Sequence, residues 1–201
     1  MDTCSIILAG GKSLRLGHDK VFETVGNASL LQQVISRISP VCRNIIVVIS
    51  GERSFPQLSR YSNCRTVTDV FPGKGPLGGI YTGLVASDST VNLVVACDMP
   101  FLNQKLLRYL IKLSTKYDLV VPQINGYSEP LHAVYKKSCI APIEKLIKQE
   151  NLRIYDFYNS VKIRYVSDRE IDKFDPGHQS FFNINTTADL KLARKIAKGN
   201  N

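Results

Sequence analysis

The chain has 201 residues, of which 44% are hydrophobic, and its 26 basic and 17 acidic side chains give a net charge of +9 at pH 7. This length predicts one domain over residues 1–201, large enough to bury a core without disulfides or structural metals. The longest apolar runs are far too short to span a membrane and the N-terminus lacks a signal-peptide layout, so a cytoplasmic protein with no membrane partner is expected.

Short apolar runs alternate with segments of helical period over the first three quarters of the chain. Strands are predicted at Cys4 to Ala9, Ile45 to Ile49, Arg65 to Thr68, Val91 to Ala96 and Leu119 to Val121. Helices are predicted at Leu30 to Ile38, Leu77 to Ala86, Gln104 to Leu113 and Ile140 to Lys148. The alternation predicts a three-layer α/β/α, Rossmann-like fold whose mostly parallel sheet has helices on both faces. Such sheets bind ligands at the carboxyl ends of their strands.

The alternation ends after Lys148. Two strand-like pieces follow, at Lys162 to Val166 and at Phe181 to Asn183, and a last helix is expected from about Thr187 to Ala197. Its start is well marked, because Thr186 and Asp189 fit a capping box.

A glycine-rich loop with several cations follows the first predicted strand. It runs Leu8-Ala9-Gly10-Gly11-Lys12-Ser13-Leu14-Arg15-Leu16-Gly17-His18-Asp19-Lys20. Without Cβ atoms, Gly10 and Gly11 allow main-chain N–H groups to approach a ligand closely. The cations of Lys12, Arg15 and Lys20 suit a polyphosphate, so the loop is predicted to bind a nucleoside triphosphate.

Two better-known phosphate loops do not fit this stretch. A Walker A motif needs glycine where Ile6 stands, and no G-x-G-x-x-G follows the strand. The alternative is that the two glycines only form a turn, the commoner role of an isolated Gly-Gly pair. The stretch from Leu8 to Lys20 as a whole favours a nucleotide-binding loop.

An aspartate follows the predicted strand that ends at Ala96. In Cys97-Asp98-Met99-Pro100 it is placed at the same sheet edge as the glycine-rich loop. Magnesium binds through one or two carboxylates together with phosphate oxygens and water, so Asp98 is the candidate metal ligand. The alternative is that Asp98 caps a turn before Pro100.

Two further polar groups are predicted at this edge. Asp69 ends a strand and precedes a Gly- and Pro-rich loop that includes Gly78; the alternative is a surface loop with no ligand. In the stretch Asn183 to Thr186, Asn183 and Asn185 point the same way if the segment is extended. They are expected either to bind polar groups of a substrate or to cap the last helix.

Charge and cysteine usage narrow the class of protein. The basic excess suits anionic ligands and would suit nucleic acid equally, but no DNA- or RNA-binding motif is present, so no nucleic-acid partner is expected.

The cysteines are widely spaced, odd in number and never arranged as C-x-x-C, which predicts neither a disulfide framework nor a zinc site. Cys4 and Cys97 are expected to be small core residues. The five positions are Cys4, Cys42, Cys64, Cys97 and Cys139.

Taken together, these strings resemble those of the MobA-like molybdenum cofactor guanylyltransferases, within the nucleotidyltransferase superfamily. The resemblance covers almost the whole chain. Its motifs are L-A-G-G-x-S-x-R-x-G-x-D-K at Leu8 to Lys20, an aspartate before G-P-L-x-G-I at Asp69 to Ile80, C-D-M-P at Cys97 to Pro100, and N-x-N-T at Asn183 to Thr186.

The resemblance implies a fold of the nucleotide-diphospho-sugar transferase type and transfer of GMP from GTP to the phosphate of molybdopterin or Mo-molybdopterin, with Mg²⁺ and release of pyrophosphate. It implies that Asp98 holds the metal and that Arg15, Lys20 and Asp98 support catalysis. The family usually has asparagine near Ser50, where serine can replace only part of the nucleotide contact. Implied nucleotide-binding residues are Leu8, Ala9, Gly10, Gly11, Lys20, Ser50, Asp69, Gly78 and Asp98.

The acceptor in this reaction is itself an ionised phosphate, so no histidine or serine needs activation as a nucleophile. Charge neutralisation by Mg²⁺ and by Arg15 or Lys20 is expected to stabilise the transition state. Candidates for contact with molybdopterin are His132, Asn183 and Asn185. Transient contact with other molybdenum cofactor proteins is also expected.

Two alternatives stay open at this point. One is a related nucleotidyltransferase that uses CTP or a sugar-phosphate acceptor; CTP-using relatives tend to have L-A-A-G, and the missing methyl at Gly10 favours a purine. The other is a non-catalytic nucleotide- or RNA-binding module. The presence of both Lys20 and Asp98 argues against a decayed site.

Overall fold

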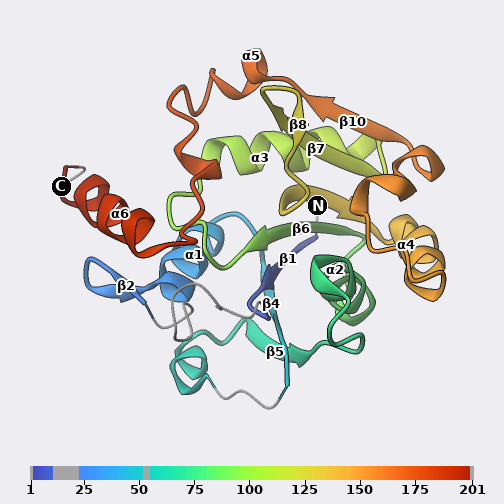
Figure 1. Cartoon of the computed structure of the whole chain (residues 1–201), viewed down its shortest axis with the longest axis horizontal. Coiled ribbons are helices and arrows are strands. Elements are labelled where there is room, and N and C mark those ends of the chain that lie inside the picture. The colour runs from blue at the N-terminus through green and yellow to red at the C-terminus, as the bar shows by residue number, and fades with distance from the viewer. Residues whose placement is uncertain (1, 11–22, 52–54, 200–201) are drawn as a thin grey trace.

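The computed structural model describes residues 2–10, 23–51 and 55–199 (Figure 1). Their main sheet has the strand order β10-β7-β9-β6-β1-β4-β5, and β8 pairs with β7 beside this path. The strands are β1 (Thr3–Leu8), β4 (Asn44–Ile49), β5 (Cys64–Thr68), β6 (Val91–Ala96), β7 (Leu119–Ile124), β8 (Tyr127–Ser128), β9 (His132–Lys136) and β10 (Ile163–Val166).

The sheet is mostly parallel, as predicted. Strand β1 lies at its centre and pairs in parallel with β4 on one side and β6 on the other. The exceptions are β9, which runs antiparallel between β6 and β7, and the short β8, which pairs antiparallel with β7. Sequence patterning missed β9 because it is a short run whose strand character depends on its two buried neighbours. The N-terminal end of β9 therefore lies at the edge where β6 ends.

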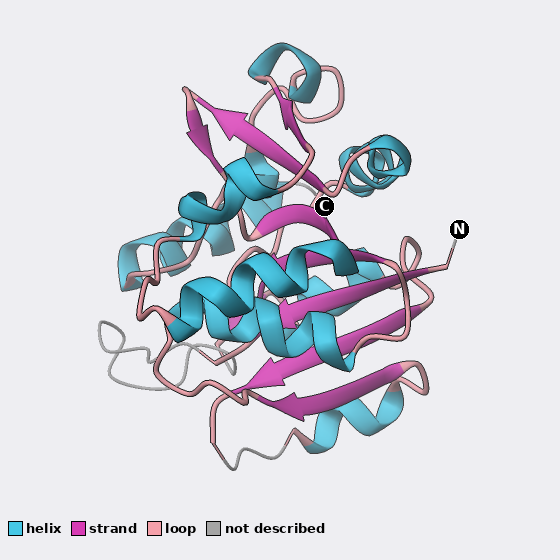
Figure 2. Ribbon diagram, turned by 90° about the vertical axis from the view of Figure 1, so that its right-hand side faces the viewer, coloured by secondary structure: helices cyan, strands magenta, loops and turns pink. Residues whose placement is uncertain are grey.

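Helices cover both faces of the sheet, which confirms the predicted three layers (Figures 1 and 2). Helices α1 (Leu30–Ile38) and α3 (Gln104–Leu113) bury their apolar side chains against one face. Helices α2 (Gly75–Ala86) and α4 (Ile140–Lys148) do the same on the other. All four match the predicted segments to within two residues at either end.

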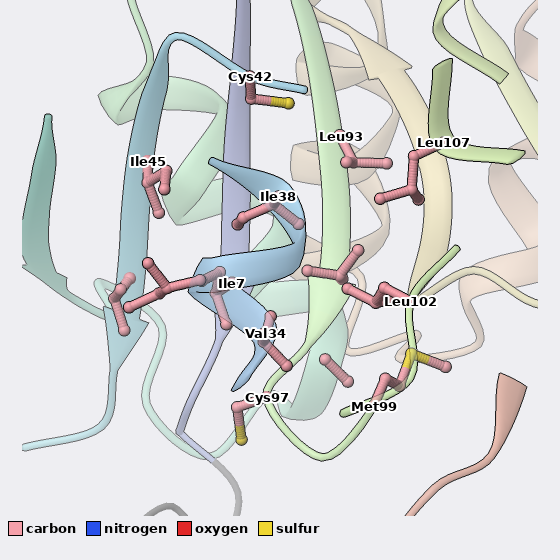
Figure 3. Close-up of a cluster of buried hydrophobic side chains, with 14 of the residues drawn as sticks. Ile7, Val34, Ile38, Cys42, Ile45, Leu93, Cys97, Met99, Leu102 and Leu107 are labelled. Carbon is pink, nitrogen blue, oxygen red and sulfur yellow. The ribbon is translucent and has the colours of Figure 1, made fainter. Parts of the chain in front are cut away.

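The core between α1 and the sheet is built from side chains that alternate along the strands. In Figure 3, Val34 and Ile38 of α1 lie against Ile7 of β1 and Leu93 of β6. All four are fully buried. Because burying each such side chain stabilises the fold by roughly 1.5–3 kcal/mol, this layer holds the central strands in fixed register.

The last part of the chain packs beside the sheet. Helix α6 (Thr187–Gly199) begins at the predicted residue, and Thr186 and Asp189 form the expected reciprocal cap. It packs through Leu190 and Ala193 against the hairpin of β2 (Thr24–Val25) and β3 (Ala28–Ser29) (Figure 1). Short helical elements complete the fold: η2 (Pro56–Arg60), η3 (Ser114–Lys116), η4 (Lys137–Cys139), η5 (Ile154–Ser160), α5 (Asp168–Ile171) and η6 (Gln179–Phe181).

One predicted strand is wrong. The segment Phe181 to Asn183 forms no strand; η6 ends at Phe181 and the chain then continues without regular structure. Both edges of β6 are already paired, with β1 and β9, so a further strand has no place beside it.

All five cysteines are free thiols, and Cys4 and Cys97 are buried as predicted. Within the described parts of the chain, no helix combines the length and apolarity that a membrane crossing requires.

Candidate functional site

The candidate site lies where the strand order of the sheet reverses. From β1 the chain moves outward through β4 to β5, and then returns to place β6 on the other side of β1. The segments that leave β1 and β6 therefore diverge from neighbouring strand ends. Open α/β sheets bind ligands at such a switch point, outside the carboxyl ends of the strands.

Backbone hydrogen bonds hold these strand ends together. The N–H of Cys97 donates to the carbonyl of Leu8 at 3.1 Å, and the N–H of Ala9 donates to the carbonyl of Val48 at 2.9 Å. The structure thus brings together the start of the glycine-rich loop and the Cys97 to Pro100 turn, as the sequence predicted.

Asp98 sits in this turn with its neighbours anchored in the core. Cys97 and Met99 on either side are buried in the cluster between α1 and the sheet (Figure 3). The Asp98 side chain itself is only 8% exposed. A carboxylate on so firmly held a backbone is well placed to face a ligand at the switch point.

Among the described residues, no group of three or more histidine, cysteine, aspartate or glutamate side chains could hold a metal ion. Asp98 on its own would supply one protein carboxylate. Such a donor set fits Mg²⁺ bound mainly by phosphate oxygens and water, and does not fit a cation that needs a cage of protein ligands.

Ser50 lies one residue beyond β4, beside the start of the glycine-rich loop. Its hydroxyl donates a hydrogen bond to the carbonyl oxygen of Gly10 at 2.7 Å. The space beside the Gly10 Cα is also taken by Ser50 Oγ. The steric reason for glycine at position 10 is thus found within the protein, in addition to any effect on the base of a nucleotide.

Asp69 follows β5 and organises the loop before α2. Its Oδ1 accepts hydrogen bonds from the backbone N–H of Phe71 at 3.0 Å and from the hydroxyl of Thr82 at 2.8 Å. Thr82, which sequence reasoning missed, is only 2% exposed. Gly78 is buried in α2, where a Cβ would lie 2.8 Å from the Phe71 carbonyl oxygen. Both positions therefore have a structural role, and their contact with a nucleotide stays a prediction.

The two asparagines lie beside the Asp98 turn. Between them Ile184 is fully buried, while Asn183 is half-buried and Asn185 is exposed. The Asn183 side-chain amide donates to the carbonyl of Phe181 at 3.2 Å. The cap of α6 is made by Thr186 and Asp189, with the Asn185 backbone N–H also bonded to Asp189. The Asn185 side chain is thus not needed as the capping group.

His132 is the site candidate whose surroundings differ most from expectation. It lies at the start of β9, is 0% exposed, and stacks on Phe181 with ring centroids 4.4 Å apart. Within the described residues neither of its ring nitrogens makes a hydrogen bond of good geometry, although the nearby Ser180 backbone acts to raise the pKa of the ring. Burial lowers the pKa of His132 to about 4, against the opposing effect of the Asp175 charge. Direct contact of His132 with a substrate would require Phe181 to move.

Three predicted site residues lie outside the described residues: Gly11, Arg15 and Lys20. The same holds for Lys12 in the predicted loop. The described part of the loop is Leu8, Ala9 and Gly10, and it leads directly from β1 to the switch point. Thr82 and Phe181 carried no sequence signal, since each acts through tertiary contacts.

Comparisons with known proteins give a consistent result. The model of the MobA-like NTP transferase domain family matches residues 5–162. A probable molybdenum cofactor guanylyltransferase of Pelotomaculum thermopropionicum is 35% identical over 198 residues, covering 98% of this chain and 95% of the relative. The molybdenum cofactor guanylyltransferase of Desulfosudis oleivorans is 32% identical, covering 96% of this chain and 95% of the relative.

A solved structure agrees with these relatives. The crystal structure of molybdopterin-guanine dinucleotide biosynthesis protein A from Archaeoglobus fulgidus superimposes with a TM-score of 0.84 at 29% identity. The match covers 98% of this chain and 99% of that one. The similarity therefore extends to the segments after residue 162, including α6.

Proposed function

The chain belongs to the MobA-like NTP transferase family, and we propose that it transfers GMP from GTP to the phosphate of molybdopterin, releasing pyrophosphate, in the synthesis of molybdopterin guanine dinucleotide. The observation that carries the proposal is the meeting of the Leu8 to Gly10 segment with the Asp98 turn at the switch point of the sheet. The names of the full-length relatives are the basis for guanine as the base and for the molybdenum cofactor as the acceptor.

The reaction joins two phosphates. An oxygen of the acceptor phosphate attacks the α-phosphorus of GTP, the bond to the β-phosphate breaks, and pyrophosphate leaves. Because the attacking oxygen is already ionised near neutral pH, the protein's task is to align the two phosphates and to neutralise their charge. This agrees with the proposed site, in which Arg15, Lys20 and Mg²⁺ would supply the positive charge.

The nucleotide would lie along the segment that leaves β1. We assign Leu8, Ala9 and Gly10 to the base and ribose side, with Ser50 and Asp69 bordering them. Gly11 and Gly78 are further candidates for this contact. Arg15 and Lys20 are assigned to the phosphates on their charge and spacing alone, since both lie outside the described residues.

Asp98 would hold Mg²⁺ together with phosphate oxygens. A metal at this point would supply positive charge to the α-phosphate as negative charge develops there. Asp98 is suited to this role because its backbone is anchored and its side chain is mostly shielded from solvent.

The acceptor would bind on the side of Asn183 and Asn185, across the Asp98 turn from the nucleotide. Exposed amides can donate to and accept from the polar groups of a pterin or a phosphate. We place His132 behind this surface, in contact with Phe181.

We further propose that residues 1–201 form one domain, that the protein works in the cytoplasm, and that it contacts other molybdenum cofactor proteins transiently. Its substrates would be GTP and molybdopterin or Mo-molybdopterin. Membranes and nucleic acid are not proposed as partners.

The test is pyrophosphate release by the purified protein with Mg²⁺ and molybdopterin, comparing GTP, CTP, ATP and UTP. Release with GTP, dependent on molybdopterin, is the expected result. Pyrophosphate release with CTP alone would mean that the transferred nucleotide is CMP and not GMP. Binding of GTP without pyrophosphate release under any condition would favour a non-catalytic module.

A further inference from the structure

Ser50 makes a contact that its place in the sequence does not suggest. It lies one residue beyond β4, and its hydroxyl donates to the carbonyl oxygen of Gly10 at 2.7 Å. The two residues are 40 positions apart, so this bond exists only in the folded protein. It ties the carboxyl end of β4 to the last described residue before the rest of the glycine-rich loop.

The same hydroxyl occupies the space beside the Cα of Gly10. A Cβ built there would lie closer than 3.0 Å to Ser50 Oγ, nearer than real Cβ atoms come to other atoms. Its next contacts would be the Ser50 backbone nitrogen at 3.3 Å and Cβ at 3.5 Å. Gly10 does not have a positive φ, so glycine provides space for the Ser50 hydroxyl here and no special backbone conformation.

We propose that Ser50 is a positioning residue of the nucleotide site, which acts through the backbone of Gly10 and not by touching the nucleotide. The Gly10 carbonyl belongs to a planar peptide group. A hydrogen bond to its oxygen therefore fixes the orientation of the Gly10 carbonyl where the chain leaves β1, beside the proposed base and ribose contacts. This inference rests on the proposed nucleotide site and names a residue that sets its geometry.

The proposal makes Ser50 and Gly10 energetically coupled. A methyl group at position 10 must displace Ser50 Oγ, and the displaced hydroxyl loses the Gly10 carbonyl. Gly10→Ala and Ser50→Ala would then remove the same hydrogen bond. In the Ser50→Ala background the clash with Oγ is gone, and the new methyl would meet the Cβ of residue 50 at 3.5 Å and its backbone nitrogen at 3.3 Å, which requires only a small shift.

The experiment is calorimetric titration with GTP and Mg²⁺, without the acceptor, on the wild type, Ser50→Ala, Ser50→Thr, Gly10→Ala and the double alanine variant. Ser50→Ala is expected to weaken GTP binding roughly 2- to 10-fold, the effect of one neutral hydrogen bond. Ser50→Thr keeps the hydroxyl and is expected to stay within about twofold of the wild type.

The coupling between the two substitutions shows whether Ser50 positions Gly10 or contacts the nucleotide directly. If Ser50 acts through Gly10, adding Gly10→Ala to Ser50→Ala weakens GTP binding by a smaller factor than adding it to the wild type, because the shared hydrogen bond is already lost. If the Ser50 hydroxyl contacts the nucleotide itself, the two losses multiply, and that result would overturn the proposal.

A matched control is available in Ser39. Its hydroxyl also donates to a backbone carbonyl at 2.7 Å, that of Ile35, at the end of α1 remote from the switch point. Ser39→Ala is expected to leave GTP binding unchanged. A wild-type protein that binds no nucleotide would overturn the proposed function and this inference together, whereas GTP binding unaffected by Ser50→Ala would overturn the inference alone.

Discussion

The backbone N–H of Ile184 donates a hydrogen bond to the carbonyl oxygen of Asp98 at 3.1 Å. This bond joins the turn after β6 to a segment 86 residues later in the chain, and the fully buried Ile184 side chain fixes it in place. The bond therefore holds the proposed metal ligand close to the segment that carries the proposed acceptor-binding asparagines.

Asp98→Asn is expected to leave a folded protein whose transfer rate is lowered about 100-fold or more, the usual effect of losing a transition-state charge contact. The measurement is the initial rate of pyrophosphate release, with thermal unfolding to confirm the fold. Asp88→Asn is the matched control, because Asp88 is exposed near the opposite end of β6. Unchanged turnover in Asp98→Asn would place the metal elsewhere.

Asn185→Ala is expected to raise the KM for molybdopterin several-fold and to leave the affinity for GTP unchanged. The Asn185 side chain is exposed, so the free energy of unfolding should change by less than about 0.5 kcal/mol. Steady-state kinetics at varied acceptor and calorimetry with GTP measure the two effects. Asn159→Ala, at an exposed position in η5, serves as the control. A loss of GTP affinity in Asn185→Ala would show that the acceptor side has been misassigned.

Thr82→Val is expected to lower the free energy of unfolding by about 1–2 kcal/mol, since it removes the buried hydroxyl that bonds Asp69 Oδ1 and the Val70 N–H. Denaturant unfolding measures this loss. The exposed Thr115→Val provides the comparison.

A comparison of Asp69→Ala with Thr82→Val tests the role of Asp69. Asp69→Ala would lose both the loop anchor and the proposed nucleoside contact, so it should weaken GTP binding more than Thr82→Val does. Equal losses of GTP affinity would leave Asp69 with the anchoring role only.

His132 predicts a pH dependence of stability. In the unfolded chain it gains a proton near pH 6.5, whereas in the folded protein burial lowers its pKa to about 4. Between these values the unfolded state binds more protons, so stability is lost as the pH falls from 6.5 to 4. The contribution at pH 7 relative to pH 4.5 is about 2 kcal/mol on this basis.

Replacing His132 with phenylalanine would keep a ring against Phe181 and remove the titration. Denaturant unfolding at pH 7 and pH 4.5 should show a smaller loss in His132→Phe than in the wild type. His178→Gln, which alters a histidine paired with Asp172 near the surface, should retain the His132 contribution. If His132→Phe and the wild type lost the same stability between pH 7 and pH 4.5, the buried His132 ring would not be the source of the pH dependence.

The sequence could predict the parts of the site that follow long apolar runs. Leu8 ends β1, and Ala9, Gly10 and Asp98 follow within two residues of the ends of β1 and β6, whose nearly continuous burial gives a clear pattern. The bond between Ser50 and Gly10 could not be predicted, because it depends on how two strand ends meet. The burial of His132 depends in the same way on β9 and on Phe181, 49 residues later.

The false strand at Phe181 to Asn183 has a related cause. Two aromatic residues followed by a polar one resemble the start of an alternating strand. In the structure η6 begins after His178, which has a φ of 50°, and the backbone N–H of Ile184 then bonds the turn after β6. The local sequence pattern of this segment is that of a strand. It forms none because both edges of β6 are already paired with other strands.

The most direct measurement follows the α-phosphate of GTP. Protein is incubated with Mg²⁺, molybdopterin and GTP labelled at the α-phosphorus or, separately, at the γ-phosphorus, and the products are separated and identified by mass. The account predicts that the α-label enters molybdopterin guanine dinucleotide while the γ-label leaves in pyrophosphate. An α-label found only in free GMP or unreacted GTP, with active acceptor present, would contradict guanylyl transfer.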